Sequence, residues 1–425
     1  MSLRALRRAV STLRLSLKPR ANGPTPVDVA DLLGRKAVNL DTPELQRFLA
    51  GKRVLVTGAG GSIGSEICRQ SMKFCPGRLI LLDRAENALF EIDRELRERW
   101  VGAPIEPVVA DVTDATRIRH VFERHEPQVV FHAAAHKHVP MMELNPGEAI
   151  KNNVFGTKTV AEAAAEFGAA AFVLISTDKA VNPTSVMGAA KRVAELYVQS
   201  LNDCRLPIAD CRMTASSIGN RQSAIANTRF LAVRFGNVLG SSGSVVPIFR
   251  RQIEAGGPVT VTHPDMKRFF MTIPEASQLV MQAGAIGKGG EIFVLDMGQP
   301  VRILDLALEM IRRSGMKPGE DIEIHYSGVR PGEKLYEELA GDNEQTAATS
   351  HAKIRVWKLP RASGEQVESM LGSLSRTVDG PREDVIAALA NCVPEYKPNG
   401  QPVAPVVPSL RLVTPDDDSA ASEAA

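Results

Sequence analysis

The sequence predicts an α/β protein with a doubly wound parallel sheet, and two observations carry this prediction. From residue 52 onward, short apolar runs that suit buried strands alternate with charged amphipathic stretches that suit helices. The first apolar run, 53–56, is followed by the glycine-rich turn 57–64 (TGAGGSIG) and then by a helical stretch. A strand, a glycine turn and a helix in this order are typical of the Rossmann-type fold.

The glycine turn is the predicted binding site for the pyrophosphate of a dinucleotide. Gly58 allows the tight turn, Gly61 lets the backbone approach the pyrophosphate, and Gly64 lets the helix pack on the strand. Ser62 and Ile63 begin the helix, whose free N–H groups face the negative charge. A glycine-rich turn that binds nothing is the alternative, and the strands that follow argue against it.

The adenosine half of the cofactor is predicted at the ends of the next strands. Asp83 ends the second apolar run about twenty residues after the turn, where an acid can hold the ribose. Asp83 repels a 2′-phosphate, although Arg84 beside it can accept one, so NAD is predicted in preference to NADP. The other predicted contacts are Asp111 and Val112 beside the adenine and the small residues Ala133 and Ala134, which allow close approach.

The candidate chemical groups follow the fifth apolar run, 171–176. A hydroxyl, an acid and an amine emerge together as Thr177, Asp178 and Lys179, at the sheet edge where ligands bind in this fold. A helix that carries Lys191 comes next. A capped turn with one salt bridge is the alternative explanation for an isolated Asp–Lys pair.

Further motifs continue this pattern along the chain. In order they are HAAAHKHVP at 132–140, RFGNVLGSSGSVVP at 234–247, RPGEKL at 330–335 and VPEY at 393–396. With the glycine turn and the Thr-Asp-Lys run, they resemble the extended short-chain dehydrogenase/reductases over residues 31–398. More narrowly, they resemble the bacterial nucleotide-sugar 4,6-dehydratases of capsule and O-antigen assembly, which act on UDP-N-acetylglucosamine.

Met187 is a departure from the wider superfamily. The superfamily has Tyr-x-x-x-Lys where this chain has Met187 and Lys191, and a thioether does not accept the proton of a sugar hydroxyl. The long dehydratases resemble this chain in having Met there, so the resemblance implies an active enzyme. A 4-epimerase or reductase on a similar substrate and a non-catalytic NAD-binding scaffold are the alternatives. Those long members also carry transmembrane helices before the catalytic unit, and a soluble form without them is expected here.

The resemblance also implies a reaction. NAD takes hydride from C4 of the hexose and returns it to C6, and water leaves from C5 and C6 in between. Lys179 is the implied C5 base if burial and positive charge lower its pKa, and Asp178, kept protonated in a dry site, is the implied acid for the C6 hydroxyl. Lys191 bonds the nicotinamide ribose, while Thr177, a bound water or Asp178 through water accepts the C4 proton. The Met187 form goes with retained configuration at C5, which gives UDP-2-acetamido-2,6-dideoxy-xylo-hexos-4-ulose.

Later residues are predicted to hold the sugar nucleotide. The candidates are Lys137 after the fourth strand, Asn237, Ser244 and Val245 after the sixth, and Arg268, Arg330 and Glu333. Arg268 suits the diphosphate because its planar fork matches two oxygens. Arg330 and Glu333 suit a phosphate and the uridine ribose. For each arginine, a surface salt bridge is the alternative.

Composition limits the class of protein. The 425 residues carry a net charge of +2, so no broad basic field for nucleic acid is expected. Five cysteines without a CxxC pair suit a reducing cytoplasm rather than a disulfide or zinc framework. The histidines of 132–138 lack nearby carboxylates and are expected to be structural, so no metal site is predicted. We also expect a homo-oligomer.

The chain divides into segments by composition. They are a basic amphipathic segment and linker (1–26), a lead-in segment (27–51), an NAD-binding domain (52–240) whose sheet continues at 291–298, a mainly substrate-binding subdomain (241–397) and a disordered tail (398–425). Contact of 1–26 with the inner face of the cytoplasmic membrane is one interpretation. A solvated tail and an organellar targeting peptide are the others. The polar stretch 204–227 is predicted to be a loop over the site or a partner contact.

Overall fold

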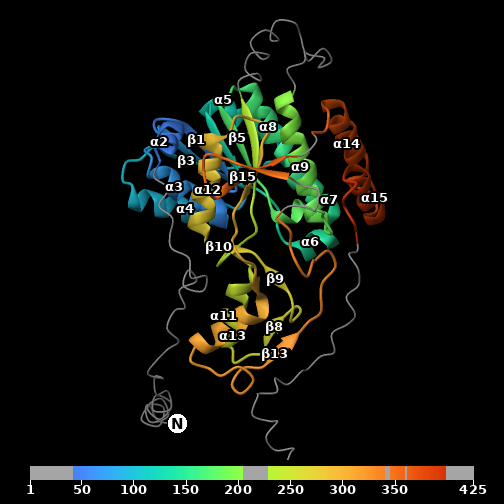
Figure 1. Ribbon diagram of the computed structural model, residues 1–425. Coiled ribbons are helices and arrows are strands. Elements are labelled where there is room, and N and C mark those ends of the chain that lie inside the picture. Colours follow the sequence, from blue (N-terminus) through green and yellow to red (C-terminus); the bar gives the residue numbers. More distant parts are fainter. Residues whose placement is uncertain (1–41, 204–227, 340–344, 359–360, 399–425) are drawn as a thin grey trace, which may run out of the picture.

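The computed structural model describes residues 42–203, 228–339, 345–358 and 361–398. They form a large lobe built on a sheet and a smaller lobe, which lies beneath it in Figure 1. The predicted N-terminal segment, the polar stretch 204–227 and the tail from residue 399 lie outside the described residues, as does the lead-in segment up to residue 41.

A mostly parallel sheet organises the large lobe. Its strands are β1 (Arg53–Thr57), β2 (Arg78–Asp83), β3 (Ile105–Val109), β4 (Val129–His132), β5 (Ala171–Ile175), β6 (Arg229–Arg234), β11 (Ile292–Leu295), β14 (Gln345–Ala348) and β15 (Ile354–Lys358). Within the described residues their order is β14-β15-β11-β6-β5-β4-β1-β2-β3. The strands from β11 to β3 are parallel, and β15 and β14 extend one edge antiparallel. The predicted Rossmann-type fold class is confirmed.

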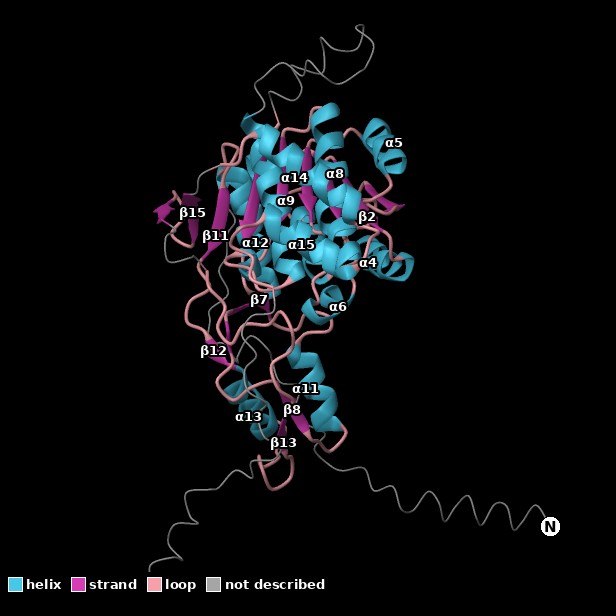
Figure 2. Ribbon diagram, turned by 90° about the vertical axis from the view of Figure 1, so that its right-hand side faces the viewer, coloured by secondary structure: helices cyan, strands magenta, loops and turns pink. Residues whose placement is uncertain are grey.

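Helices cover both faces of this sheet (Figures 1 and 2). One face carries α2 (Pro43–Leu49), α3 (Ser62–Met72), α4 (Glu86–Arg99) and α12 (Ile273–Ile286). The other carries α5 (Ala115–His125), α8 (Gly156–Glu166) and α9 (Val186–Asp203), with α14 (Gly364–Thr377) and α15 (Arg382–Cys392) packed against α9. Burial on both faces explains the continuous apolar runs, since Leu79 and Leu81 face the first helix layer whereas Ile80 and Leu82 face the second.

The smaller lobe has a core of its own. Its elements are β7 (Asn237–Val238), α11 (Val245–Glu254), β8 (Val259–Val261), β9 (Lys267–Arg268), β10 (Phe270–Met271), β12 (Val301–Arg302), α13 (Ile303–Arg313) and β13 (Ile324–Tyr326). The apolar faces of α11 and α13 meet there, with Phe249, Met310 and Ile324 in the core. The predicted subdomain 241–397 is shared between the lobes, because the apolar runs of β11 and β15 join the large sheet.

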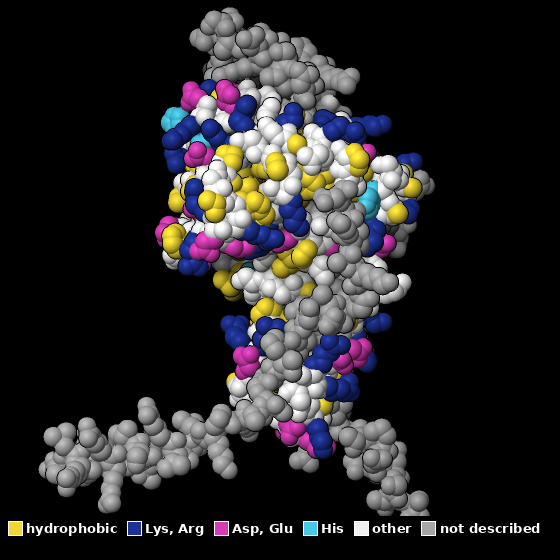
Figure 3. Space-filling view, turned by 90° about the vertical axis from the view of Figure 1, so that its left-hand side faces the viewer, with side chains coloured by type: hydrophobic (Ala, Val, Ile, Leu, Met, Phe, Trp, Pro, Cys, Tyr) yellow, Lys and Arg dark blue, Asp and Glu magenta, His cyan; other side chains and the backbone are white. Residues whose placement is uncertain are grey.

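The surface carries mixed charge. On the side seen in Figure 3, acidic and basic side chains are interspersed over both lobes rather than gathered by sign. In the part of the chain that the structure describes, no helix combines the length and the apolar character that a bilayer crossing requires.

A buried ion pair lies behind the carboxyl ends of β5 and β6. Nε of Arg234 on β6 donates to Oε1 of Glu195 on α9 at 2.6 Å, and the hydroxyl of Ser176 donates to the same oxygen at 2.7 Å. The Arg234 guanidinium also lies 3.6 Å from the ring centroid of Trp357 on β15. Both charged side chains are almost fully buried, so these contacts must compensate for lost water. The pair thereby fixes the end of the sheet from which Thr177 emerges.

The substitution Arg234→Met should lower the free energy of unfolding by about 3–5 kcal/mol, because it leaves the Glu195 carboxylate buried without its main partner. The matched control is Arg119→Met, which removes a half-exposed ion pair with Glu166 and should cost less than about 1 kcal/mol. Urea unfolding followed by circular dichroism measures both losses. Equal losses in the two variants would contradict the importance of the buried pair.

Candidate functional site

The glycine turn and the end of β4 approach so closely that side chains are excluded between them. Gly58 has a φ of +66°, and a Cβ on it would lie 2.7 Å from the amide nitrogen of Ala134. A Cβ on Gly64 would lie 2.0 Å from the carbonyl oxygen of Gly58, so α3 packs directly on the turn. A Cβ on Gly61 would have one atom of the described residues within 4 Å. That atom is the carbonyl oxygen of Gly58, at 3.1 Å. Gly61 therefore leaves room beside the N-terminus of α3, where a phosphate can approach.

A cavity of about 150 Å³ opens beside this turn. It is lined by Gly58, Gly61, Leu82, Asp83, Arg84, Ala110, Val112, Ala133, Ala134, Ala135, His136 and Asn152. The two carboxylate oxygens of Asp83 accept the backbone N–H groups of Gly60 and Ala85, both at 2.9 Å. Nη1 of Arg84 lies 3.5 Å from Oδ2 of Asp111. Burial raises the pKa of Asp111, but hydrogen bonds from the following turn and the charge of Arg84 outweigh burial and hold this pKa below its usual value.

Asn152 and Asn153, which were not predicted as site residues from the sequence, lie at the cavity beside His136. They belong to η1 (Lys151–Phe155), a π-helical turn between α7 (Pro146–Ile150) and α8. Asn153 donates to the carbonyl of His136 at 2.9 Å and accepts its N–H at 2.8 Å, while Asn152 lines the cavity. Such turns recur at functional sites. The adjacent pair of asparagines inside a helical stretch was the available signal.

His132 is a buried link between β1, β4 and α8. The hydroxyl of Thr157 donates to the carbonyl of Asn153 at 2.7 Å, so it accepts from Nε2 of His132 at 3.1 Å. Nδ1 of His132 then accepts the hydroxyl of Thr57 at 2.8 Å. Burial and the nearby Lys191 charge lower the pKa of His132 to about 3. The imidazole is therefore neutral and serves as a structural connection at the edge of the cofactor site.

The two lobes meet at the glycine turn. The N–H of Ser242 donates to the hydroxyl of Ser62 at 3.1 Å. Nζ of Lys137 donates to the carbonyl of Ser242 at 2.8 Å and to the hydroxyl of Ser241 at 3.4 Å. Burial lowers the pKa of Lys137. Two predicted binding residues, Ser62 and Lys137, thus lie at the boundary between the lobes.

The predicted hydroxyl, acid and amine lie together at the end of β5. Thr177 precedes η2 (Asp178–Ala180), a 3-10 turn that contains Asp178 and Lys179, and the N–H of Asp178 donates to the carbonyl of Phe235 at 3.0 Å. Oδ1 of Asp178 accepts the hydroxyl of Thr177 at 2.9 Å and Nζ of Lys179 at 3.1 Å. The Asp178 side chain is fully buried, whereas that of Lys179 is 18% exposed. Oδ2 of Asp178 lies beside Gly236 and has no hydrogen-bond partner among the described residues.

Segments that link the lobes complete the surroundings of Lys179. Nζ of Lys179 lies 3.1 Å from Oδ1 of Asn237 and 3.5 Å from Oε1 of Glu337. The same Glu337 oxygen lies 3.8 Å from Nε of Arg268. Asn237 and Arg268 are predicted site residues, but Glu337 is not among them. Its signal in the sequence was the acidic pair 337–338, which follows the RPGEKL motif.

The charges around Lys179 correct the expectation that its pKa is lowered. Burial disfavours the charged amine, but the carboxylates of Asp178 and Glu337 outweigh both burial and the Arg268 charge. The pKa of Lys179 therefore lies above its ordinary value, and the expectation of a lowered pKa is wrong for this structure. That expectation counted burial and positive charge but not the carboxylates of Asp178 and Glu337, of which Asp178 has the larger effect.

Lys191, unlike Lys179, has a lowered pKa. It is 4% exposed, and its Nζ donates to the carbonyl of Ile175 at 2.9 Å. Burial, partly offset by the Glu195 charge, lowers its pKa to about 8. Met187, one turn earlier on α9, is buried in the core of the large lobe. Near neutral pH, Lys191 can therefore exchange a proton more readily than an ordinary lysine.

The predicted substrate residues differ in what they face. The buried Arg268 guanidinium donates to three backbone carbonyls, so protein groups enclose it rather than an open surface. Arg330 is exposed and donates to Oε1 of Glu333 at 2.6 Å. Oε2 of Glu333 and the hydroxyl of Ser244 are buried without partners among the described residues. Ser244 precedes Val245, the first residue of α11.

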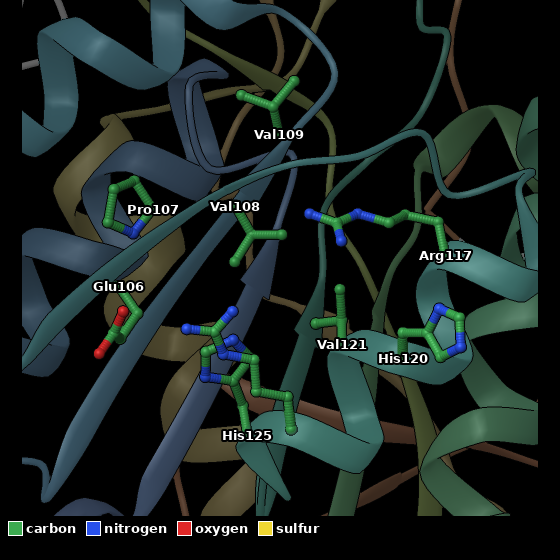
Figure 4. Close-up of a pocket in the computed structure, with 9 residues that line it drawn as sticks. Glu106, Pro107, Val108, Val109, Arg117, His120, Val121 and His125 are labelled. Atoms are coloured by element: carbon green, nitrogen blue, oxygen red, sulfur yellow. The ribbon is translucent and has the colours of Figure 1, made fainter.

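A separate cavity of about 480 Å³ lies at the outer edge of the sheet, between β3 and α5 (Figure 4). Val108 and Val121 face each other across it, and the Arg117 side chain extends over one side. None of the predicted site residues lines this cavity. The chemical groups at the end of β5 therefore belong to a different part of the large lobe.

Comparison with known proteins gives the family. Residues 54–359 match the family described as "Polysaccharide biosynthesis protein", which covers well over half of the chain. The chain belongs to this polysaccharide biosynthesis family. It is 54% identical over 362 residues to the capsular polysaccharide biosynthesis protein CapD of Staphylococcus aureus, covering 85% of this chain and 57% of CapD. The chain spans about half the length of the curated relatives at the head of this comparison.

The chain is also similar to an enzyme and to a solved structure outside these capsular proteins. A UDP-glucose 4-epimerase of Rickettsia rickettsii (strain Sheila Smith) is 34% identical over 302 residues, which cover 70% of this chain and 80% of the epimerase. The X-ray structure of Pen from Bacillus thuringiensis is 34% identical with a TM-score of 0.64, covering 74% of this chain and 90% of Pen. This chain therefore resembles both proteins over more than two thirds of its length.

Proposed function

We propose that the protein is a 4,6-dehydratase that removes water from UDP-N-acetylglucosamine, with retained configuration at C5, for surface polysaccharide synthesis. The observation that carries the proposal is the 3.1 Å contact between Nζ of Lys179 and Oδ1 of Asp178 at the end of β5. A base and an acid joined by one hydrogen bond suit an elimination, in which one carbon loses a proton and its neighbour loses a hydroxyl. Membership of the polysaccharide biosynthesis family supports the setting.

The glycine turn at 57–64 has the shape that a dinucleotide requires. Gly58 and Gly64 have no space for a side chain, whereas Gly61 leaves open the position that a pyrophosphate would take. NAD is proposed over NADP, because Arg84, the group that could hold a 2′-phosphate, is paired with Asp111. When bound, the nicotinamide would accept hydride from C4, which acidifies the C5 proton, and would return it to C6.

One internal proton transfer would convert the observed pair into the working pair. Nζ of Lys179 donates to Oδ1 of Asp178, which is the arrangement of an ammonium with a carboxylate. Moving this proton to Oδ1 gives a neutral amine and a carboxylic acid without changing the number of protons. The amine can then take the C5 proton while the acid supplies a proton to the C6 oxygen, so that water leaves. When hydride is added at C6, the Lys179 ammonium would return a proton to C5, and the proton released from the C4 hydroxyl balances the one that leaves with water. Exclusion of water by a bound sugar favours the uncharged pair.

Thr177 is proposed to carry the proton from Asp178 to the C6 oxygen. The Asp178 side chain is fully buried, whereas Thr177 is partly exposed and lies one hydrogen bond away. The Thr177 hydroxyl can accept the proton of the acid and give its own to the leaving hydroxyl. Lys191, whose lowered pKa of about 8 gives it a neutral fraction near neutral pH, is the proposed acceptor of the C4 proton in its uncharged form, which leaves Thr177 for the later step at C6.

The sugar nucleotide is proposed to lie where the lobes meet. Ser244 and Val245 at the start of α11 and the cations Lys137 and Arg330 suit the diphosphate. Glu333 suits the uridine ribose. Buried oxygens of Ser244 and Glu333 lack partners within the described part of the chain, which supports these roles because buried polar atoms normally have partners.

A 4-epimerase is the second candidate, because a UDP-glucose 4-epimerase of Rickettsia rickettsii is 34% identical to this chain. An epimerase returns hydride to C4 and needs no base at C5. The Asp178–Lys179 pair would then have no chemical role, which favours the dehydratase.

The purified protein with UDP-N-acetylglucosamine should give a product that is lighter by one water, with no net NADH. Mass spectrometry and absorbance follow these two quantities. Lys179→Ala should lower kcat by at least about a hundredfold because it removes the C5 base. Lys158→Ala, which removes a lysine paired with Glu162 on α8, is the control and should leave kcat unchanged. A product of unchanged mass would support the epimerase instead.

Gly61→Ala should separate cofactor binding from folding. Its Cβ meets one oxygen at 3.1 Å, so the free energy of unfolding should fall by less than about 1 kcal/mol. The methyl group occupies the pyrophosphate position, so the Kd for NAD should rise at least about tenfold in calorimetry. Gly64→Ala, whose Cβ would lie 2.0 Å from a carbonyl oxygen, should instead destabilise the fold itself. Wild-type NAD affinity in Gly61→Ala would place the pyrophosphate elsewhere.

A further inference from the structure

Glu337 shares one carboxylate oxygen between two cations. Its Oε1 lies 3.5 Å from Nζ of Lys179 and 3.8 Å from Nε of Arg268, and its side chain is 3% exposed. The two cations differ chemically, because a lysine can lose its proton whereas a guanidinium remains charged in proteins. The charge of Glu337 is therefore always balanced by Arg268, and by Lys179 only while Lys179 is protonated.

The groups around Lys179 match an ammonium. Among the described residues, Nζ faces three acceptor oxygens, which belong to Asp178, Asn237 and Glu337. An ammonium has three N–H donors for them, whereas a neutral amine has two donors and a lone pair. A carboxylate that faces the lone pair repels it. Glu337 therefore favours the protonated amine, and burial makes its effect larger than at the surface.

We propose that Glu337 is a positioning residue that sets the proton affinity of Lys179, with Arg268 as the counter-ion that keeps Glu337 neutralised when Lys179 is uncharged. Three backbone carbonyls fix the Arg268 guanidinium beside Glu337. The charged groups that face Lys179 in this arrangement are Asp178, Glu337 and Arg268. The consequence for catalysis rests on the proposed function, whereas the effect on Lys179 does not.

This arrangement links the lobes to the chemistry. Lys179 follows β5 of the large lobe, whereas Glu337 lies on the strand-like segment beside β9, where the N–H of Lys267 donates to the carbonyl of Leu335 at 3.0 Å. A movement of the lobes apart would lengthen the contact between Glu337 and Lys179 and lower the proton affinity of the amine. A movement together would raise it.

The direct test is the pKa of Lys179 in Glu337→Gln, which keeps the size of the side chain but removes its charge. Competitive labelling with trace acetic anhydride across pH, read by mass spectrometry, gives this pKa with the exposed Lys317 as internal reference. Loss of one neighbouring carboxylate should lower it by roughly 1–3 units. The matched control is Glu338→Gln, the adjacent acid, which contacts Lys334 and Asn182. It should leave the pKa of Lys179 unchanged.

The pH profile of kcat/KM gives a second readout. Its alkaline limb reports loss of the proton that Asp178 and Lys179 share, so in Glu337→Gln this limb should move to lower pH by the same amount. Glu337→Asp keeps the charge but places it farther from Lys179, so it should shift the alkaline limb less. This variant provides the test if Glu337→Gln does not fold. An unchanged Lys179 pKa in a folded Glu337→Gln overturns the inference. If Glu337→Gln lowers the Lys179 pKa but the wild-type protein gives no dehydrated product, the proposed function is contradicted and the inference about Glu337 stands.

Discussion

The hydrogen bond from Lys179 to Asp178 depends on where a parallel strand ends. β5 lies between β4 and β6, so its carboxyl end opens between two neighbouring strand ends. The turn after β5 does not leave the sheet, because the N–H of Asp178 is held by the carbonyl of Phe235 beyond β6. Gly188 on α9 allows equally close packing, since a Cβ there would lie 2.1 Å from the carbonyl oxygen of Lys179. Backbone contacts therefore fix the turn that carries the acid and the amine, and neighbouring side chains then hold the Lys179 amine.

Buried charge is distributed around this contact in two groups. Behind it, Glu195 joins Arg234 and Ser176, and ahead of it, Glu337 joins Lys179 and Arg268. In a low-dielectric interior each of these charges needs a partner, and changing one alters the proton affinity of its neighbours. The raised pKa of Lys179 follows from its carboxylate partners, which outweigh burial, whereas the lowered pKa of Lys191 follows from burial, which outweighs the Glu195 charge. Two amines with opposite shifts suit a reaction that moves protons at two adjacent carbons.

The sequence was informative wherever function depends on local spacing. The glycine turn, the acid at the end of β2 and the triplet after β5 each stand where an apolar run ends, so the end of that run predicts their place in the fold. Contacts between distant segments were not predictable in this way. Glu337 reaches Lys179 because a segment returns from the smaller lobe, and Arg268 faces inward because of carbonyls in that same segment. The pKa of Lys179 was predicted in the wrong direction because the charges of the adjacent Asp178 and of the distant Glu337 were both left out.

The central claim is that Lys179 and Asp178 exchange protons with C5 and C6 of a hexose. The most direct measurement is the reaction with UDP-N-acetylglucosamine in deuterium oxide, stopped at early times and read by mass spectrometry and NMR. The account predicts a 4-keto-6-deoxy product that carries one solvent deuterium, at C5, while the hydride from C4 is found at C6 without exchange. A product with no deuterium at C5, or one that keeps its C6 hydroxyl, would contradict it.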